Sequence, residues 1–236
     1  MAAPAVKRFY REVSTAAAGA GWQVLLDGRG LKTVGGRPQQ VPSAPLAEAL
    51  AAEWATQGDE INPASFILRD MADYALDVVA NEPAGAVAAL LPYGETDTLC
   101  YRAEPEEPLY TRQLAVWEPL LTRAEAEWGL RFVRISGIIH RPQEPATVAA
   151  LQARLAALSP FSLAALRTLA GLAASLTIGL LALEPGADIA ALWDAASLEE
   201  EWQAELWGRD WEAEEHRARR GATFAAAARF AELAAS

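Results

Sequence analysis

LDGRGLKTVGGRPQQVPS, residues 26–43, alternates short extended segments with glycine-rich turn signals. The turn signals are Asp27-Gly28 and Gly35-Gly36, and such pairs favour the tight turns of β-hairpins. The extended segments around and between them are residues 22–26, 31–34 and 39–41. This order predicts a meander of small antiparallel strands near the start of the chain.

The same glycines also suit a loop that binds phosphate. In such a loop the glycines open directly onto a helix whose N-terminal amides receive the anion, and a Lys followed by Ser or Thr closes the motif. Lys32-Thr33 resembles that closing pair, but the glycines before it are Gly28 and Gly30, and more turn residues and Pro38 follow. The hairpin is therefore the prediction, and the phosphate loop is the minor alternative.

Two helices are predicted after the meander. The first starts after Pro42 and ends near Gly58, because Ser43 can cap its free amides and Pro45 suits an early helical position. Its apolar residues recur at helical spacing, at Leu46, Leu50 and Trp54. The second helix covers residues 67–81, and one of its faces carries Met71, Tyr74, Ala75 and Val78.

Three aspartates, Asp70, Asp73 and Asp77, lie along another face of that second helix. Paired carboxylates can supply acid and base chemistry or bind a metal, so this face would carry the activity of a metal-dependent hydrolase or lyase. A solvated helix face explains the same pattern more simply. A contact role for Asp77 is the stronger of the functional hypotheses.

The rest of the chain divides into a mixed part and a helical part. Residues 98–103 and 131–139 resemble strands, and residues 108–128 between them resemble a helix around Pro119. After residue 145 the strand signals stop, and helices are predicted over residues 147–158, 162–183, 189–207 and 210–233. The predicted fold class is therefore α+β, with a mixed domain over residues 1–145, containing a small antiparallel sheet, and an all-α domain over residues 146–236.

Composition narrows the possible partners. The chain has 31 acidic and 20 basic side chains, and its formal charge of -11 repels a phosphate backbone, which argues against nucleic acid as a partner. Cys100 is the single cysteine, and His140 and His216 lie far apart, so neither a disulfide nor a zinc site is expected. No cofactor, metal or small-molecule substrate is predicted.

Residues 168–183 form a run of sixteen uncharged residues between Arg167 and Glu184. The run is shorter than a bilayer span and rich in Ala and Gly, so it predicts a buried helix and no stable membrane insertion. The tail, residues 197–211, holds three of the eight tryptophans among acidic residues. Tryptophan beside carboxylates is typical of a protein-contact surface. A helix with its tryptophans in the core and its acidic face exposed to solvent would have the same sequence pattern.

Six motifs occur along the chain in a fixed order: KRFY (7–10), LDGRGLKT (26–33), LAEALAAEWATQ (46–57), YALDVV (74–79), TDTLCYRA (96–103) and QAELWG (203–208). This order resembles one family, the assembly chaperone of the F-type ATP synthase that attends the α subunit of the catalytic head. One departure is Val34, where the family usually has Pro, a residue that only stiffens a turn or edge.

The resemblance implies a chaperone, not an enzyme, that binds the unassembled α subunit and shields its interface for the β subunit. The family's characteristic positions carry over as partner-binding residues Glu53, Trp54, Gln57, Asp77, Asp97, Gln113, Glu200, Gln203, Trp207 and Gly208. Glu200 is the first choice for a true contact, because a charge beside Trp202 has little reason to be a packing element. Trp54 has an alternative role as a core residue between helix and sheet.

Other functions and two locations stay open at this point. The chain could be a general peptide-binding or regulatory module, which would bind many apolar segments with similar affinity. The Asp70, Asp73 and Asp77 hydrolase is the weaker alternative. The Ala-rich chain without a recognisable leader predicts a bacterial cytoplasmic protein, or a mitochondrial matrix protein if a transit peptide has been removed.

Overall fold

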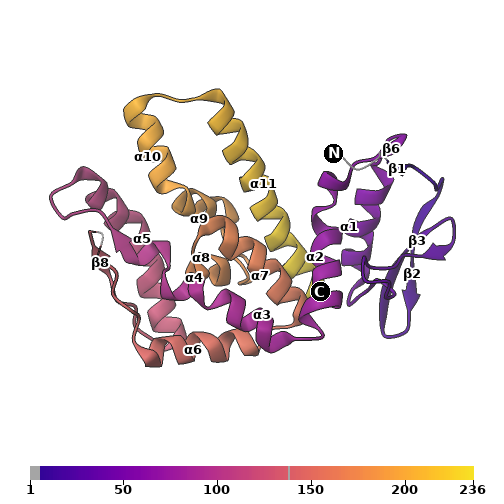
Figure 1. Ribbon diagram of the computed structural model, residues 1–236, viewed down its shortest axis with the longest axis horizontal. Helices are drawn as coiled ribbons and strands as arrows, with labels where there is room; N and C mark the ends of the chain where they lie inside the picture. Colours follow the sequence, from indigo (N-terminus) through magenta and orange to yellow (C-terminus); the bar gives the residue numbers. More distant parts are fainter. Residues whose placement is uncertain (1–5, 138) are drawn as a thin grey trace.

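The computed structural model describes residues 6–137 and 139–236 (Figure 1). Near its start the chain forms an antiparallel sheet around one central strand, β3 (Gly21–Leu26), which pairs with β2, β4 and β5. These neighbours are β2 (Val13–Ala18), β4 (Arg29–Gly30) and β5 (Gln40–Val41). The antiparallel meander is confirmed for the predicted segments 22–26 and 39–41, but residues 31–34 form no strand: the strand after the turn is β4, and Lys32 makes only an isolated bridge with Pro38. The sheet also contains β2, a strand whose Ala-rich sequence gave no clear signal.

The turn between β3 and β4 shows why this segment is a hairpin. Asp27 and Gly28 both have positive φ, 48° and 76°, the conformation that a tight hairpin turn needs. The Asp27 carboxylate accepts hydrogen bonds from the amides of Glu12 and Arg11, and these bonds lower its pKa. The glycines lead into a strand, not into a helix, so the phosphate-loop alternative is wrong.

Helix α1 (Ala44–Ala55) packs on the sheet and is followed by α2 (Ile67–Tyr74), which continues into the π-helical turn η2 (Ala75–Val79) (Figure 1). Ser43 caps α1 by accepting from the Leu46 amide at 3.1 Å. Between α1 and α2 the chain forms β6 (Glu60–Ile61), paired with β1 (Val6–Lys7), and the short helix η1 (Pro63–Ser65). Both predicted helices are confirmed.

The middle of the chain is more helical than predicted. Helices α3 (Pro83–Leu90) and α4 (Pro92–Glu95) stand where no element was predicted. Residues 98–103 form the 3-10 turn η3 (Thr98–Cys100) and only then the strand β7 (Tyr101–Arg102), because Asp97 caps the Leu99 amide and bends the chain. The predicted strand over residues 131–139 shrinks to β8 (Ile135–Ser136), parallel to β7, and its residue 138 lies outside the described residues. Helix α5 (Pro108–Trp128) confirms the prediction around Pro119.

The C-terminal part is helical, as predicted, but two predicted helices are each broken in two. The run over residues 162–183 breaks at Ala174, whose φ is 48°, and Ser175 caps the helix that follows. Residues 189–207 break at Ser197. The resulting helices are α6 (Pro145–Ala156), α7 (Pro160–Ala173), α8 (Leu176–Leu181), α9 (Ile189–Ala196), α10 (Leu198–Trp207) and α11 (Trp211–Ala234).

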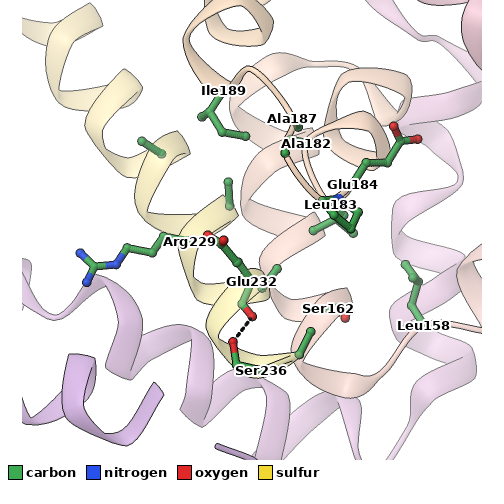
Figure 2. Close-up of a pocket in the computed structure, with 16 residues that line it drawn as sticks. Leu158, Ser162, Ala182, Leu183, Glu184, Ala187, Ile189, Arg229, Glu232 and Ser236 are labelled. Atoms are coloured by element: carbon green, nitrogen blue, oxygen red, sulfur yellow. Dashed lines mark hydrogen bonds between the residues drawn. The ribbon is translucent and has the colours of Figure 1, made fainter. Parts of the chain in front are cut away.

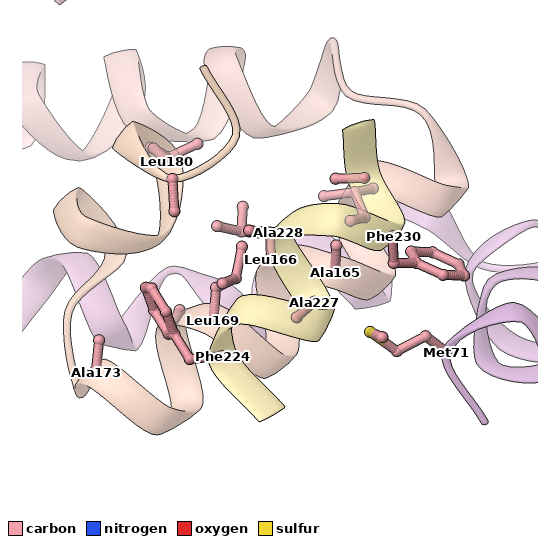
Figure 3. Close-up of a cluster of buried hydrophobic side chains, with 14 of the residues drawn as sticks. Met71, Ala165, Leu166, Leu169, Ala173, Leu180, Phe224, Ala227, Ala228 and Phe230 are labelled. Carbon is pink, nitrogen blue, oxygen red and sulfur yellow. The ribbon is translucent and has the colours of Figure 1, made fainter. Parts of the chain in front are cut away.

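The C-terminal half of α11 packs into the core of the molecule. Figure 3 shows Phe224 on the side of Leu169 and Ala173, and Phe230 on the side of Met71 from α2. The Ser43 hydroxyl also donates to the Leu233 carbonyl at 2.5 Å, which joins the end of α11 to the start of α1. One cluster of buried side chains thus includes residues of both predicted domains, and the boundary near residue 145 stays a prediction.

The apolar run over residues 168–183 is buried in this core, which confirms the predicted burial. None of the helices in the described ranges combines the length and the apolar character that a bilayer span demands.

Candidate partner-binding site

The ten predicted partner-binding residues separate into two groups. Six have side chains that join elements of the body of the molecule: Glu53, Trp54, Gln57, Asp77, Asp97 and Gln113. Four lie on the helical hairpin made by α10 and α11: Glu200, Gln203, Trp207 and Gly208. The two groups differ in what each residue contacts.

Glu53 and Trp54 connect α1 to α2. The two Glu53 carboxylate oxygens accept from the amides of Leu68 and Arg69 at 2.7 and 2.9 Å, so Glu53 serves as the missing cap of α2. Burial raises the pKa of Glu53, and these two hydrogen bonds oppose the rise. The Trp54 ring is 4.5 Å from the Phe66 ring between centroids and only 7% exposed, so Trp54 is a core residue.

Gln57 organises the loop after α1. Its Nε2 donates to the Glu53 carbonyl at 2.9 Å and to the Ser65 hydroxyl at 2.8 Å, and its Oε1 accepts from the Asn62 amide at 2.8 Å. Gln57 is buried, and all three bonds are internal. These bonds fix the path of the loop that connects α1 to α2.

Asp77 and Asp73 hold the glycine-rich hairpin against the second helix. Asp77 accepts from the Thr33 hydroxyl and from the Gly35 amide, both at 2.7 Å. Asp73 accepts from the Gln39 side chain at 2.6 Å, and burial raises its pKa. Gly35 is needed for this approach, because a Cβ there would lie 2.7 Å from the Asp77 carboxyl carbon.

Asp70 takes no part in these contacts, since it pairs with the neighbouring Arg69 at 2.6 Å. Within the described ranges no group of three or more His, Cys, Asp or Glu side chains is placed to hold a metal ion. Asp73 and Asp77 are engaged by hydrogen-bond donors of the hairpin. These contacts give the aspartates a structural role and offer no support for the hydrolase alternative.

Asp97 and Gln113 are fully buried connectors. Asp97 accepts from the Leu99 amide at 3.1 Å and from the Thr177 amide at 2.8 Å, so it links the middle of the chain to α8; its burial raises its pKa. Gln113 accepts from the Ala103 amide at 2.8 Å and donates to the Glu199 carboxylate at 2.8 Å. Gln113 therefore joins α5 to the start of α10.

The hairpin of α10 and α11 extends from the body, and its turn lies at the far end (Figure 1). Gly208, with a φ of 99°, ends α10, and Asp210 caps α11 by accepting from the Ala213 amide at 2.9 Å. The side chain of Trp207 is 82% exposed and that of Trp211 is 75% exposed. The alternative of core tryptophans is therefore wrong for these two, and the contact surface around the turn stays a prediction.

Ion pairs hold α10 in place, since Leu198 is its one buried residue. On the side of α5, Arg112 contacts both oxygens of Glu205, at 2.5 and 2.9 Å, and lies 5.6 Å above the Trp202 ring. On the side of α11, Glu200 pairs with Arg220 at 2.8 Å. Glu201 pairs with Arg217 and Arg209. Glu200 thus has a partner inside the chain, which the sequence did not reveal.

A cleft of about 530 Å³ separates α10 from α11 near the turn. Gln203, Trp207 and Gly208 line it from the α10 side, and Ala213, His216 and Arg217 line it from α11. The Trp207 indole donates to the Gln203 side chain at 2.9 Å, which orients the ring. Leu206 and Trp211 are exposed near this cleft and were not among the predicted residues, although the Trp-rich acidic tail contained the signal.

A second cavity, of about 550 Å³, lies at the other end of α11, beside the turn between α8 and α9 (Figure 2). Its lining is mainly small and apolar, and the charged side chains on it include Glu184, Arg229 and Glu232. None of the ten predicted residues lines it. The α10–α11 hairpin is therefore the candidate site.

Comparisons with known proteins agree with this architecture. Residues 7–125 match the family described as ATP12 chaperone protein. Atp12 from Paracoccus denitrificans is 37% identical, with a TM-score of 0.89 over 97% of this chain and 98% of that chain, and a single-residue variant of that protein gives the same values. The Atu1473 protein from Agrobacterium tumefaciens is 35% identical, with a TM-score of 0.91 over 96% of this chain and 85% of that chain. This chain belongs to the ATP12 chaperone family.

Proposed function

We propose that this chain assists assembly of the F-type ATP synthase by binding the unassembled α subunit and shielding the surface that later meets the β subunit. Membership of a chaperone family supports the class of function. The observation that carries the binding role is the exposure of Trp207 and Trp211 at the turn of a hairpin that ion pairs such as Arg112–Glu205 and Glu200–Arg220 hold in place. Exposed aromatic side chains on an ordered support are the usual anchors of protein recognition.

Physical reasoning favours a binder of this kind. An unassembled subunit exposes an apolar interface that invites self-association. An acidic protein that covers this interface reversibly keeps the subunit monomeric until the correct partner replaces it. The proposal involves no covalent step, so the chain acts by binding alone.

The first test mixes the purified chain with isolated ATP synthase α subunit and, separately, with β subunit. Light scattering follows aggregation, and size-exclusion chromatography detects a complex. We expect suppression of α-subunit aggregation and a defined complex with the α subunit only. Equal binding to both subunits would favour a general peptide-binding module, and no binding to the α subunit would contradict the proposal.

Glu200 provides the residue-level test. Glu200→Lys replaces the attraction to Arg220 by repulsion at an exposed pair, so we expect a loss of stability below about 1 kcal/mol together with weaker α-subunit binding. The matched control is Glu48→Lys, because Glu48 is exposed on α1 and remote from the hairpin in sequence. If the folded Glu200→Lys variant binds as well as the control, Glu200 is not part of the site.

A further inference from the structure

The end of the α10–α11 hairpin combines exposed apolar surface with unbalanced negative charge. We define the tip surface as Leu206, Trp207, Asp210, Trp211 and Glu212, which surround the turn between the two helices. Leu206 is 57% exposed, and both tryptophans are more exposed still. Large apolar side chains grouped at one end of a structure mark an interaction site more strongly than scattered ones do.

The tip surface is held in a fixed shape before any partner arrives. Gly208 allows the sharp exit from α10, and the Asp210 carboxylate fixes the first turn of α11 by capping the Ala213 amide. The Gln203 side chain accepts the indole N–H of Trp207. A preorganised aromatic surface loses little conformational entropy on binding, which favours affinity.

The four arginines between residues 209 and 220 already have carboxylate partners. Arg209 contacts Glu201 and Glu214, Arg217 contacts Glu201 and Asp194, Arg219 contacts Glu215, and Arg220 contacts Glu200. Within the part of the chain that the structure describes, neither Asp210 nor Glu212 has a cationic side chain within 4.0 Å. Two carboxylates without an ion-pair partner in the described part of the chain therefore flank the exposed tryptophans.

We propose that the tip surface binds an apolar segment of the ATP synthase α subunit that is flanked by Lys or Arg, with the tryptophans contacting the apolar residues and Asp210 and Glu212 pairing with the cations. This inference rests on the proposed function and adds the chemistry of the recognised segment. Opposite charges around an apolar centre set the register of the complex and speed its formation. The net charge of -11 adds long-range attraction for such a segment.

The apolar part of the proposal is tested with the double variant Trp207→Ala, Trp211→Ala. Fluorescence anisotropy with labelled α subunit measures Kd, and we expect a rise of roughly 30-fold, the size typical of hot-spot residues. Phe9→Ala is the control, because Phe9 is 67% exposed but lies at the opposite end of the chain from the hairpin. We expect the control Kd to stay within about twofold and both melting temperatures to match the unchanged protein.

The charged part is tested with Glu212→Lys and with zero-length carbodiimide coupling, which joins carboxylates to lysine amines. We expect Glu212→Lys to slow association several-fold at low salt and the difference to fade at high salt, because screening removes long-range attraction. In the unchanged complex, mass spectrometry should find Glu212 or Asp210 coupled to an α-subunit lysine next to apolar residues. A Glu212→Gln, Asp210→Asn variant, which keeps the helix cap, should lose these products.

The outcomes separate this inference from the proposed function. A complex that forms with unchanged Kd in the tryptophan variant, or that yields no coupling at Asp210 or Glu212, overturns the inference while the α-subunit proposal stands. Failure of the unchanged chain to bind the α subunit at all overturns both. A large rise in Kd together with coupling to lysines flanking an apolar segment supports the inference.

Discussion

The N-terminal half of α11, residues 211–220, and its C-terminal half, residues 224–231, share one uninterrupted helix but have opposite surroundings. In the C-terminal half, Phe224 and Phe230 have no exposed surface and pack among the helices of the core. In the N-terminal half no residue is buried, and Arg217 and Arg220 contact α10 through ion pairs. The first surroundings supply stability, and the second present side chains to solvent.

The comparison teaches how a helix can extend beyond the body of a protein. Burial of each phenylalanine contributes about 1.5–3 kcal/mol, which anchors the helix. The exposed half is stabilised by local interactions instead. Asp210 caps its first turn, and Glu212 and Glu214 lie near the N-terminus of the helix, where the helix dipole is positive. Glu215 also pairs with Arg219, four residues later. The buried half that anchors α11 and the exposed half that carries Trp211 are thus separated along a single helix.

The largest difference in stability between the two halves is expected for a substitution at Phe230. Phe230→Ala leaves a cavity beside α2 and α7, so we expect a loss of about 3–5 kcal/mol in the free energy of unfolding, measured by urea denaturation. Trp211→Ala removes a larger side chain from the exposed half and should change that free energy by no more than about 0.5 kcal/mol. Similar losses at the two positions would contradict the division of α11.

A second variant tests the border between the halves. A Cβ at Gly221 would lie 2.7 Å from the Trp193 indole nitrogen, so Gly221→Ala must displace that ring. Overpacking costs about 1–3 kcal/mol, whereas replacing a helical Gly by Ala recovers about 0.5–1 kcal/mol. We expect a net loss of about 1 kcal/mol in thermal unfolding. A rise in stability would show that Trp193 moves freely and that no border exists there.

Arg217→Ala addresses the link between α10 and α11. The variant removes the contacts to Glu201 and Asp194, which are partly exposed, so the global loss should be below about 1 kcal/mol. Hydrogen exchange should nevertheless become faster in α10 and stay unchanged in α7. Arg219→Ala, which removes a pair within α11 only, is the control and should leave exchange in α10 unaltered.

The smallest expected effect is a pH dependence at the exposed pair of Arg112 and Glu205. The hydrogen bond from Arg112 lowers the pKa of Glu205. The pair therefore stabilises the contact of α10 with α5 fully above the pKa of Glu in the unfolded chain, about 4.3. This stabilisation disappears as the pH falls through the lower pKa that Glu205 has in the folded chain. The ratio of α10 exchange rates between Glu205→Gln and the unchanged chain should approach one at low pH. A ratio that does not vary with pH would contradict this role.

The sequence predicted those parts of the fold that local signals determine. Ser43 and the spacing of Leu46, Leu50 and Trp54 define α1, and Asp27-Gly28 defines the hairpin turn. The break at Ala174 could not be predicted, because Ala carries no turn signal and its positive φ follows from the packing of α7 on α8. Helices α3 and α4 were missed because they are short and joined by a single residue, Leu91.

The candidate site was predictable only in part, for a related reason. The acidic Trp-rich tail indicates a contact surface, and Trp207 is exposed as that interpretation requires. Whether a polar residue is buried depends on distant neighbours: Asp97 meets Thr177 and Gln113 meets Glu199 only after the chain has folded. Characteristic positions of a family therefore include both buried structural connectors and exposed side chains, and sequence position alone does not separate them.

The buried C-terminal half of α11 resists movement of the exposed half of the same helix. The helix has 24 residues, so it is about 36 Å long, and the Trp193 ring rests against Gly221 between its two ends. A load applied at Trp211 acts through the exposed arm and is resisted at Phe224 and Phe230, where the packing is tight. Tilting the turn end of the hairpin therefore requires work against the packing of the core, so the exposed tryptophans stand on a stiff support.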